Sequence, residues 1–284
     1  MRPPTARSLT LDLLSSLRGH SLPVAAIVAA ANLFEVQENS VRVAVARLLA
    51  SGRIERDARG RYRLGAQADP VDRQVRGWRH LEEHLRPWDG AWTGVHLGEL
   101  PLPRRRAGKR RSRALRFKGF ALLSPGLAVR PDNLQMPLAV LRTELHELGL
   151  EAGAVVFGIR DLDPASDARS RGLWNTAELC DGYRRSIQDL ERSRLQLGQI
   201  EPEAAMVESF LLGGRVIRQL VLDPLLPEPI LPASERSALV AALRDYDACG
   251  RQVWSSFMAR HGAAHIGNSG APADTRAGMA WRLH

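Results

Sequence analysis

The 284-residue sequence predicts an α+β protein of several domains, because three patterns follow one another along the chain. Residues 1–66 combine three helical patterns with an alternating pair of strands, and residues 88–170 alternate between strand and helix patterns. Residues 171–261 show helical spacing only. An apolar fraction of 44% and a charged fraction of 25% are typical of folded globular proteins, so each part is expected to form a core.

Two helices are predicted at the start of the chain. Leucines at positions 9, 13, 14 and 17 share one face of a helix over residues 5–17, and Gly19 ends that helix. Ser21 is expected to cap the second helix and Pro23 to lie in its first turn. Asn32 is expected to close it.

A third helix and a β-ribbon complete the N-terminal pattern. The helix is predicted to begin near Asn39 or Ser40, either of which can cap it, and to stop at Gly52. Alternating apolar residues, which include Ile54 and Tyr62, flank the turn sequence "DARGR". The exposed face of the helix is expected to carry Ser40, Arg42, Val43, Ala46 and Arg47.

Three helices and a ribbon in this order predict a winged helix-turn-helix domain over residues 1–66. In that fold the third helix contacts base edges in the major groove of DNA, while the ribbon contacts the neighbouring backbone or minor groove. A solvated surface without a partner is the alternative explanation of the same side chains. The predicted DNA-contacting residues are Asn39, Ser40, Arg42, Val43, Arg47, Arg56, Arg59 and Arg61.

The charge of the chain also favours a polyanionic partner. The formal net charge is +9 and the isoelectric point is about 10.7. Lys109 and Lys118 are the only lysines among 40 basic residues, and the arginine guanidinium suits bidentate contacts to phosphate and guanine. Codon usage in a GC-rich genome is an equally good explanation of the arginine content.

The rest of the chain is predicted to form two further domains. Residues 67–87 are charged and poor in apolar side chains, which predicts a linker, and residues 88–170 predict a ferredoxin-like middle domain from their strand-helix-strand-strand-helix-strand order. Residues 171–261 are expected to form a helical C-terminal domain. Residues 262–284 are rich in small residues and are expected to form a flexible tail.

Six segments, in this order, resemble the PaaX-type transcriptional regulators, which repress phenylacetate degradation genes in bacteria. The resemblance extends over about nine-tenths of the chain, and "LWN" at Leu173–Asn175 departs from the "LWD" that we expect in the family. The matching segments are "TARSLTLDLL" (5–14), "SVRVAVARLLASGRIE" (40–55), "PWDGAWTGVHL" (87–97), "LRFKGFALLSPGLAVRPDN" (115–133), "GLWNTAELCDGYRRSI" (172–187) and "LVLDPLLPEPILP" (220–232).

The resemblance implies a homodimeric repressor that binds double-stranded operator DNA. It also implies the three domains above, and release from the operator by an aryl-CoA thioester such as phenylacetyl-CoA or another acyl-CoA. Such a regulator is expected in the bacterial cytoplasm, associated with the nucleoid when bound, and it is not expected to be an enzyme or to carry a cofactor. Activation instead of repression is left open.

A basic run in the middle domain is a candidate site for the effector. Ten lysines and arginines and no acidic residue lie between Leu100 and Pro131. The run could bind CoA phosphates, contact flanking DNA, or form a solvated helix face. A CoA site also needs an apolar slot, for which tryptophans are candidate walls, although a tryptophan is more often part of a core. The tentative effector-binding residues are Trp88, Trp92, Arg110, Arg111, Lys118 and Trp174.

One motif suggests a different class of protein, a zinc-dependent hydrolase. His80, Glu83 and His84 match H-x-x-E-H, in which two histidines bind zinc and the glutamate activates water. We expect no metal site, because the motif is short and lies in the predicted linker. The candidates for a third zinc ligand are Glu144, Glu147 and Glu151.

The remaining motifs exclude other classes. Cys180 and Cys249 are isolated, so neither a disulfide framework nor a cysteine zinc site is indicated. The apolar run over residues 22–34 is too short to span a bilayer, and no membrane partner is expected. The sequence contains no G-x-S-x-G, Walker or G-x-G-x-x-G motif, which leaves hydrolysis by a serine elbow, nucleotide hydrolysis and dinucleotide chemistry without support.

Overall fold

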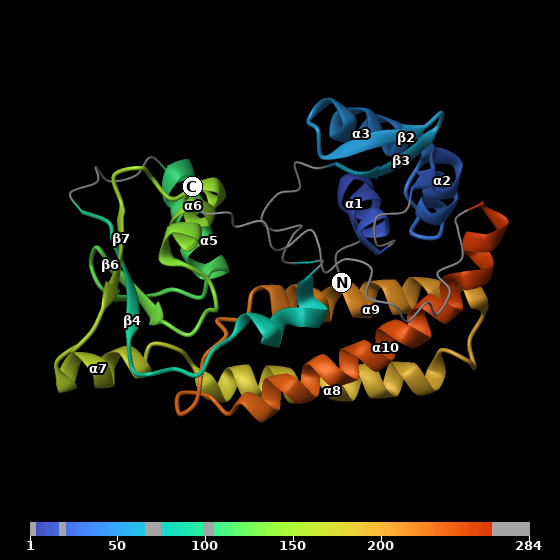
Figure 1. Ribbon diagram of the computed structural model, residues 1–284. Coiled ribbons are helices and arrows are strands. Elements are labelled where there is room, and N and C mark those ends of the chain that lie inside the picture. The colour runs from blue at the N-terminus through green and yellow to red at the C-terminus, as the bar shows by residue number, and fades with distance from the viewer. Residues whose placement is uncertain (1–3, 17–20, 66–74, 76, 99–104, 263–284) are drawn as a thin grey trace.

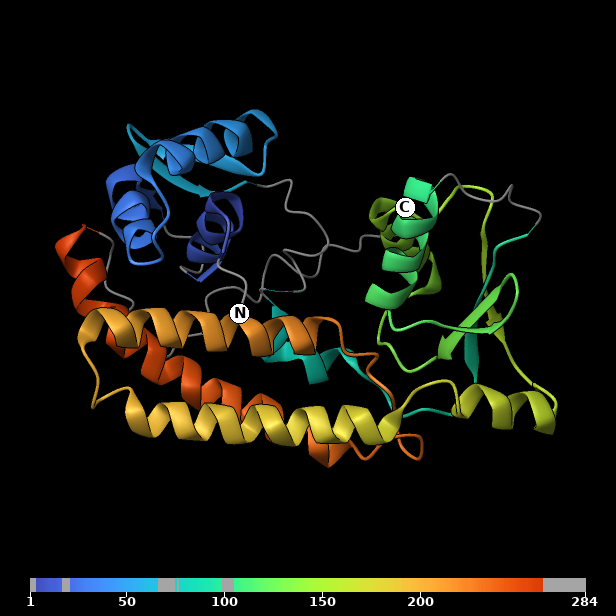
Figure 2. The same cartoon turned by 180° about the vertical axis from the view of Figure 1, so that it is seen from behind.

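The chain folds into an N-terminal unit, a middle unit and a long layer of helices. A computed structural model describes residues 4–16, 21–65, 75, 77–98 and 105–262. The helical layer is formed by α8, α9 and α10, with the middle unit at one end and the N-terminal unit packed on it near the other end (Figures 1 and 2). This mixed architecture agrees with the α+β fold class predicted from the sequence.

The N-terminal unit contains three helices and a three-stranded antiparallel sheet with the strand order β1-β3-β2. Val41, Val45 and Leu48 of the third helix are buried, as its apolar spacing predicts. The elements are α1 (Ala6–Ser16), β1 (Leu22–Pro23), α2 (Val24–Asn32), α3 (Glu38–Ala50), β2 (Ile54–Ala58) and β3 (Arg61–Leu64).

Two predicted helix starts are corrected by the structure. Leu22 pairs with Tyr62 in the sheet, which keeps the chain extended until Pro23, so α2 begins after that proline and Ser21 does not cap it. Gln37 is the N-cap of α3 and has extended dihedral angles, which places Asn39 and Ser40 inside the first turn.

An aromatic cluster joins the N-terminal unit to the helical layer. The ring centroid of Phe34, just after α2, lies 5.1 Å from that of Phe210 in α9. Phe210 in turn contacts Trp254 of α10, with ring centroids 6.1 Å apart. Phe257 and Met258 belong to the same buried cluster as Ile27. Residues from both ends of the chain therefore share one core.

The middle unit has the element order β-α-β-β-α-β that the sequence predicts, and its sheet has the strand order β5-β6-β4-β7. Leu115 of one helix and Leu141 and Leu145 of the other pack with Val95 and Ala128 of the sheet. The first strand was expected from Trp88 and begins four residues later. The elements are β4 (Trp92–His96), α5 (Arg105–Phe117), β5 (Ala121–Ser124), β6 (Leu127–Pro131), α6 (Leu138–Leu148) and β7 (Val155–Ile159).

The helical layer has one extensive apolar core, to which Tyr183, Leu220, Leu239 and Leu243 contribute. No helix among the described residues combines the length and the hydropathy needed to cross a membrane. Its helices are α8 (Thr176–Gln196), α9 (Pro202–Val221) and α10 (Ala233–Arg260), and the short helix α7 (Pro164–Arg171) precedes them.

The predicted linker is partly a structural element. Residues 67–87 lie outside the described part except for residue 75 and residues 77–87. Trp78–His84 forms a 3-10 helix, η1, whose Trp78 and Leu81 are buried in the core of the helical layer. These two apolar residues are enough to anchor the segment although its other side chains are mostly polar. The expected tail falls almost wholly outside the description, which ends at Gly262.

We predict that Gly119→Ala destabilises the contact between the middle unit and the helical layer. Gly119 has φ of +72°, and a Cβ there would lie 2.6 Å from the carbonyl oxygen of Pro224. Gly126, with φ of +82°, has no atom within 4 Å of the same position, so Gly126→Ala is the matched control for backbone strain alone. Thermal unfolding should show a Tm roughly 2 to 6 °C lower for Gly119→Ala than for Gly126→Ala. Equal melting temperatures would contradict the close contact.

Candidate functional site

The outward face of α3 is exposed and has the residues that the sequence predicted. Asn39, Ser40, Arg42 and Arg47 are all exposed, and Val43 is 41% exposed. An exposed valine beside small and basic residues on a helix leaves that face able to enter a groove. Figure 1 shows α3 on the side of the N-terminal unit that faces away from α9 and α10.

The two arginines on this face of α3 differ in their surroundings. Arg42 forms an exposed ion pair with Glu38, with Nη2 and Oε1 2.6 Å apart. Such an i,i+4 pair contributes only a few tenths of a kcal/mol, so a phosphate can replace the carboxylate at about that cost. Arg47 is exposed and has no ion pair within the described residues. Both guanidinium groups are thus available to an anionic partner.

The β2–β3 ribbon presents two of its three predicted arginines to solvent. Arg56 lies exposed on β2, and Arg59 lies exposed in the turn. Gly60 follows with φ of +74°, which lets the turn close tightly. Arg63 is paired with Glu55 at 2.6 Å, so it adds little net charge to the ribbon. The ribbon lies next to α3 in both views (Figures 1 and 2).

Arg61 has a different role from the one that its sequence position suggested. Its Nε donates to Ser21 Oγ at 3.0 Å, and its Nη2 donates to the Ser21 carbonyl oxygen at 2.8 Å. Its Nη1 donates to the carbonyl oxygen of Gly262 at 3.2 Å. The guanidinium therefore connects the ribbon to the start of β1 and to the end of α10, and it is not free on the ribbon surface. Sequence spacing gave no signal of this contact, because the partners lie 40 and 201 residues away.

The three tryptophans proposed as walls of a slot do come together. The ring centroids of Trp88 and Trp92 are 5.2 Å apart, and Trp92 and Trp174 stack with an interplanar angle of 5°. Trp92 is only 1% exposed and its indole N–H donates to Asp167 Oδ1 at 2.9 Å, so it is a core residue. Burial raises the pKa of Asp167, but hydrogen bonds from Arg171 and Trp92 outweigh it and the net pKa is lowered. Trp174 alone of the three lines a cleft.

Two of the three cations proposed for an effector are paired within the middle unit. Arg111 binds Glu151 with Nη2 and Oε1 2.8 Å apart, and Lys118 binds Glu144 at 2.5 Å. The hydrogen bond from Arg111 lowers the pKa of Glu151. These pairs attach α5 to α6, which is a structural role. Arg110 is exposed, and its side chain lies against the backbone of Gly149.

A cleft lies where the middle unit meets the helical layer. Its volume is about 620 Å³, within the range of small-molecule sites. Arg116 and Phe120 reach it from the middle unit, Trp174 and Arg185 from the start of α8, and Leu222 from the end of α9. The sequence did not point to Arg185, because its neighbours in the cleft come from distant parts of the chain.

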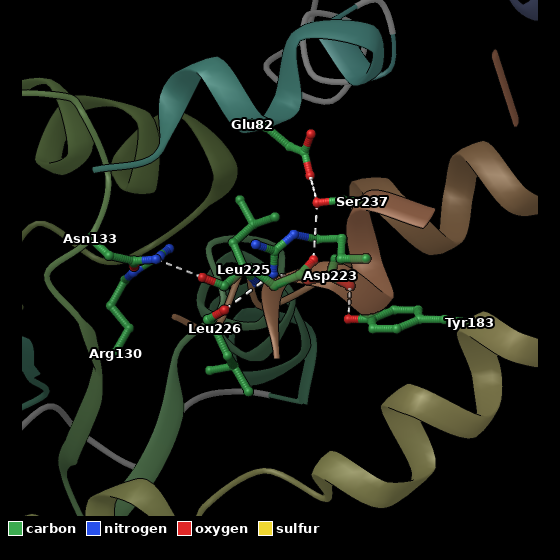
Figure 3. Close-up of polar contacts among 10 residues, drawn as sticks. Glu82, Arg130, Asn133, Tyr183, Asp223, Leu225, Leu226 and Ser237 are labelled. Carbon is green, nitrogen blue, oxygen red and sulfur yellow. Dashed lines mark hydrogen bonds and ion pairs between the residues drawn. The ribbon is translucent and has the colours of Figure 1, made fainter. Parts of the chain in front are cut away.

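A buried polar network connects the middle unit to the segment that links α9 and α10. Asn133 Nδ2 donates to the Leu225 carbonyl oxygen at 2.8 Å, and Arg130 Nη2 donates to Asn133 Oδ1 at 3.0 Å (Figure 3). Burial lowers the pKa of Arg130 to about 10, so this guanidinium remains charged at neutral pH. Asp223 accepts hydrogen bonds from the Tyr183 hydroxyl and from the Leu225 backbone N–H. None of these residues was predicted as functional.

The H-x-x-E-H motif does not form a metal site. It lies in the 3-10 helix η1, where residues four apart point about 120° away from each other, so His80 and His84 do not share a face. His80 Nδ1 lies 2.9 Å from Glu83 Oε1, and both side chains are exposed. No cluster of three histidine, cysteine, aspartate or glutamate side chains suited to a metal exists among the described residues. The zinc hydrolase alternative is therefore not supported.

Comparison with known proteins confirms the resemblance found in the sequence. The chain is 28% identical to the transcriptional repressor PaaX of Escherichia coli (strain K12) over 241 residues, which cover 78% of this chain and 74% of that protein. It has the same fold as the uncharacterized protein Rv0674 from Mycobacterium tuberculosis, with a TM-score of 0.60, 24% identity, and coverage of 89% of this chain and 99% of the other. No family model matches the chain.

We predict that Arg61→Ala lowers the stability of the N-terminal unit, whereas Arg59→Ala does not. Arg61 loses three hydrogen bonds to Ser21 and Gly262, while Arg59 is exposed in the turn. The loss of hydrogen bonds from a charged group predicts a Tm decrease of roughly 2 to 6 °C for Arg61→Ala. Differential scanning fluorimetry of both variants would test this, and a similar Tm for the two would show that the Arg61 contacts are dispensable.

Proposed function

We propose that this chain, which resembles the PaaX-type transcriptional regulators, is a sequence-specific DNA-binding transcriptional repressor. The observation that carries the proposal is the exposed face of α3 next to the arginines of the ribbon. Both are on the side of the N-terminal unit that faces away from the helical layer (Figure 1). The likeness to a protein named transcriptional repressor PaaX supports the same conclusion.

In the proposed complex the N-terminal unit acts as a winged helix. α3 enters the major groove, where Arg42 and Arg47 contact guanine edges or phosphates and Asn39 contributes from the first turn. Ser40 and Val43 are small enough to let the helix axis approach the bases. Arg56 and Arg59 contact the sugar-phosphate backbone beside that groove.

The proposed repressor acts as a cytoplasmic homodimer on the operator of an aromatic-acid catabolic operon and is released by an aryl-CoA thioester. Two copies of α3 must match two half-sites that lie about one helical turn, or a multiple of it, apart. A ligand releases the DNA only if it has a higher affinity for a dimer with a different spacing. The N-terminal unit is packed on α9 and α10 by Phe34, Phe210 and Trp254, so a change in the helical layer would reorient it.

We predict that Arg47→Ala/Arg56→Ala greatly weakens binding to the operator. Each lost contact costs about 1 to 3 kcal/mol, so the Kd should rise at least roughly 30-fold at a fixed salt concentration. Fluorescence anisotropy with DNA from upstream of the chain's own operon, at two salt concentrations, measures both the Kd and its salt dependence. The dependence of log K on log salt should become shallower by about one for each phosphate contact removed.

Arg169→Ala/Arg194→Ala is the matched control for this variant. It removes the same charge from exposed arginines of α7 and α8, far from α3 in both views (Figures 1 and 2). This control should bind operator DNA within about twofold of the unmodified chain. An equal loss in both variants would indicate that net charge alone drives binding, and unchanged binding by Arg47→Ala/Arg56→Ala would contradict the proposed role of α3 and the ribbon.

A further inference from the structure

We propose that the cleft between the middle unit and the helical layer binds an organic anion that carries an apolar group, with Arg116 and Arg185 as its anion-binding residues. The inference depends on the proposed function only in assigning this ligand the role of effector. The binding site itself follows from the geometry, charge and lining of the cleft.

The cleft exists because two parts of the fold approach each other closely. The turn between α5 and β5 contacts the segment after α9 through Gly119, which has no side chain to separate it from Pro224. Arg116 and Phe120 flank this contact on one side, and the helices α8 and α9 form the other side. A ligand in the cleft would therefore touch both the middle unit and the helical layer.

The charges in the cleft leave two guanidinium groups available. Arg116 and Arg185 are exposed and have no ion pair within the described residues. Arg215 is neutralised by Asp189, with Nη2 and Oδ2 2.6 Å apart. Glu178 is the remaining carboxylate of the lining, and it lies in the first turn of α8, where the helix N-terminus offsets its charge. Arg116 and Arg185 are thus the two cations of the lining that an anion can use.

The opposite character of the other lining residues defines the rest of the ligand. Leu222 is 42% exposed, which is unusual for a large apolar side chain without a partner. Leu179 and Pro224 line the same cleft, and the Trp174 ring is fixed in place by its stacking on Trp92. An inorganic anion would leave these apolar groups exposed to water, and a neutral apolar molecule would leave the arginines unpaired.

A thioester of coenzyme A combines the two required properties, because its phosphates match guanidinium groups and its acyl group matches the apolar side chains. The other exposed cations of α5 provide a competing site for phosphates. Lys109, Arg110 and Arg113 are exposed on that helix but do not line the cleft. The experiment must therefore separate the cleft from this helix surface.

Isothermal titration calorimetry with phenylacetyl-CoA, free CoA and phenylacetate tests the site directly, without DNA. The unmodified chain should bind the thioester more tightly than either part alone. Arg116→Gln/Arg185→Gln should weaken binding of phenylacetyl-CoA and of CoA by roughly 10- to 100-fold. Leu222→Ser should reduce the advantage of the thioester over CoA and leave CoA binding nearly unchanged.

Arg113→Gln/Arg194→Gln is the matched control, because it changes one exposed arginine on α5 and one on α8, neither of which lines the cleft. This control should bind phenylacetyl-CoA within about twofold of the unmodified chain. An equal loss in both double variants, no loss in Arg116→Gln/Arg185→Gln, or no binding by the unmodified chain would each overturn the proposal.

Operator binding without ligand, measured on the same variants, separates this proposal from the proposed function. A chain that binds the operator but not phenylacetyl-CoA keeps its function as a DNA-binding regulator and loses the ligand site. A chain that binds phenylacetyl-CoA in the cleft without binding the operator keeps the site and loses the proposed function.

Discussion

One buried carboxylate holds together the junction on which the arrangement of the protein depends. The side chain of Asp223 is 1% exposed and lies 4.0 Å from Arg236, and it accepts hydrogen bonds from the Tyr183 hydroxyl and the Leu225 N–H. Burial raises the pKa of Asp223, while Arg236 and the two hydrogen bonds oppose the increase. The Leu225 carbonyl oxygen then accepts from Asn133 of the middle unit (Figure 3). The loop conformation and the domain contact are thus set by the same few atoms.

The two junctions of the helical layer differ in their physical character. Hydrogen bonds at the middle unit, such as that from Asn133, are directional and hold one orientation. The N-terminal unit is held mainly by apolar contacts of Phe34 with Phe210 and its neighbours, which tolerate small rotations better than hydrogen bonds do. Regulation of DNA binding by movement of the N-terminal unit therefore needs less energy than regulation by separation of the middle unit.

The sequence predicted the order of the elements and the exposed face of α3, because both follow from the spacing of apolar residues along single elements. It could not predict contacts between elements. Arg61 binds the carbonyl oxygen of Gly262, and Arg111 is neutralised by Glu151, although spacing suggested that both arginines face an external partner. Trp78 joins the core of the helical layer although its segment is mostly polar. Periodicity shows which face of an element is buried, but not which distant side chain it meets.

The aromatic cluster between the two ends of the chain also affects how the protein is synthesised. Phe34 leaves the ribosome early, but Trp254 and Phe257, which cover the same core, are added about 220 residues later. At roughly 5 to 20 residues per second, the apolar surface of α2 stays uncovered for about 10 to 40 s. During that time the nascent N-terminal unit is a substrate for chaperones and for association with other chains. Folding of this unit is complete only when α10 has emerged.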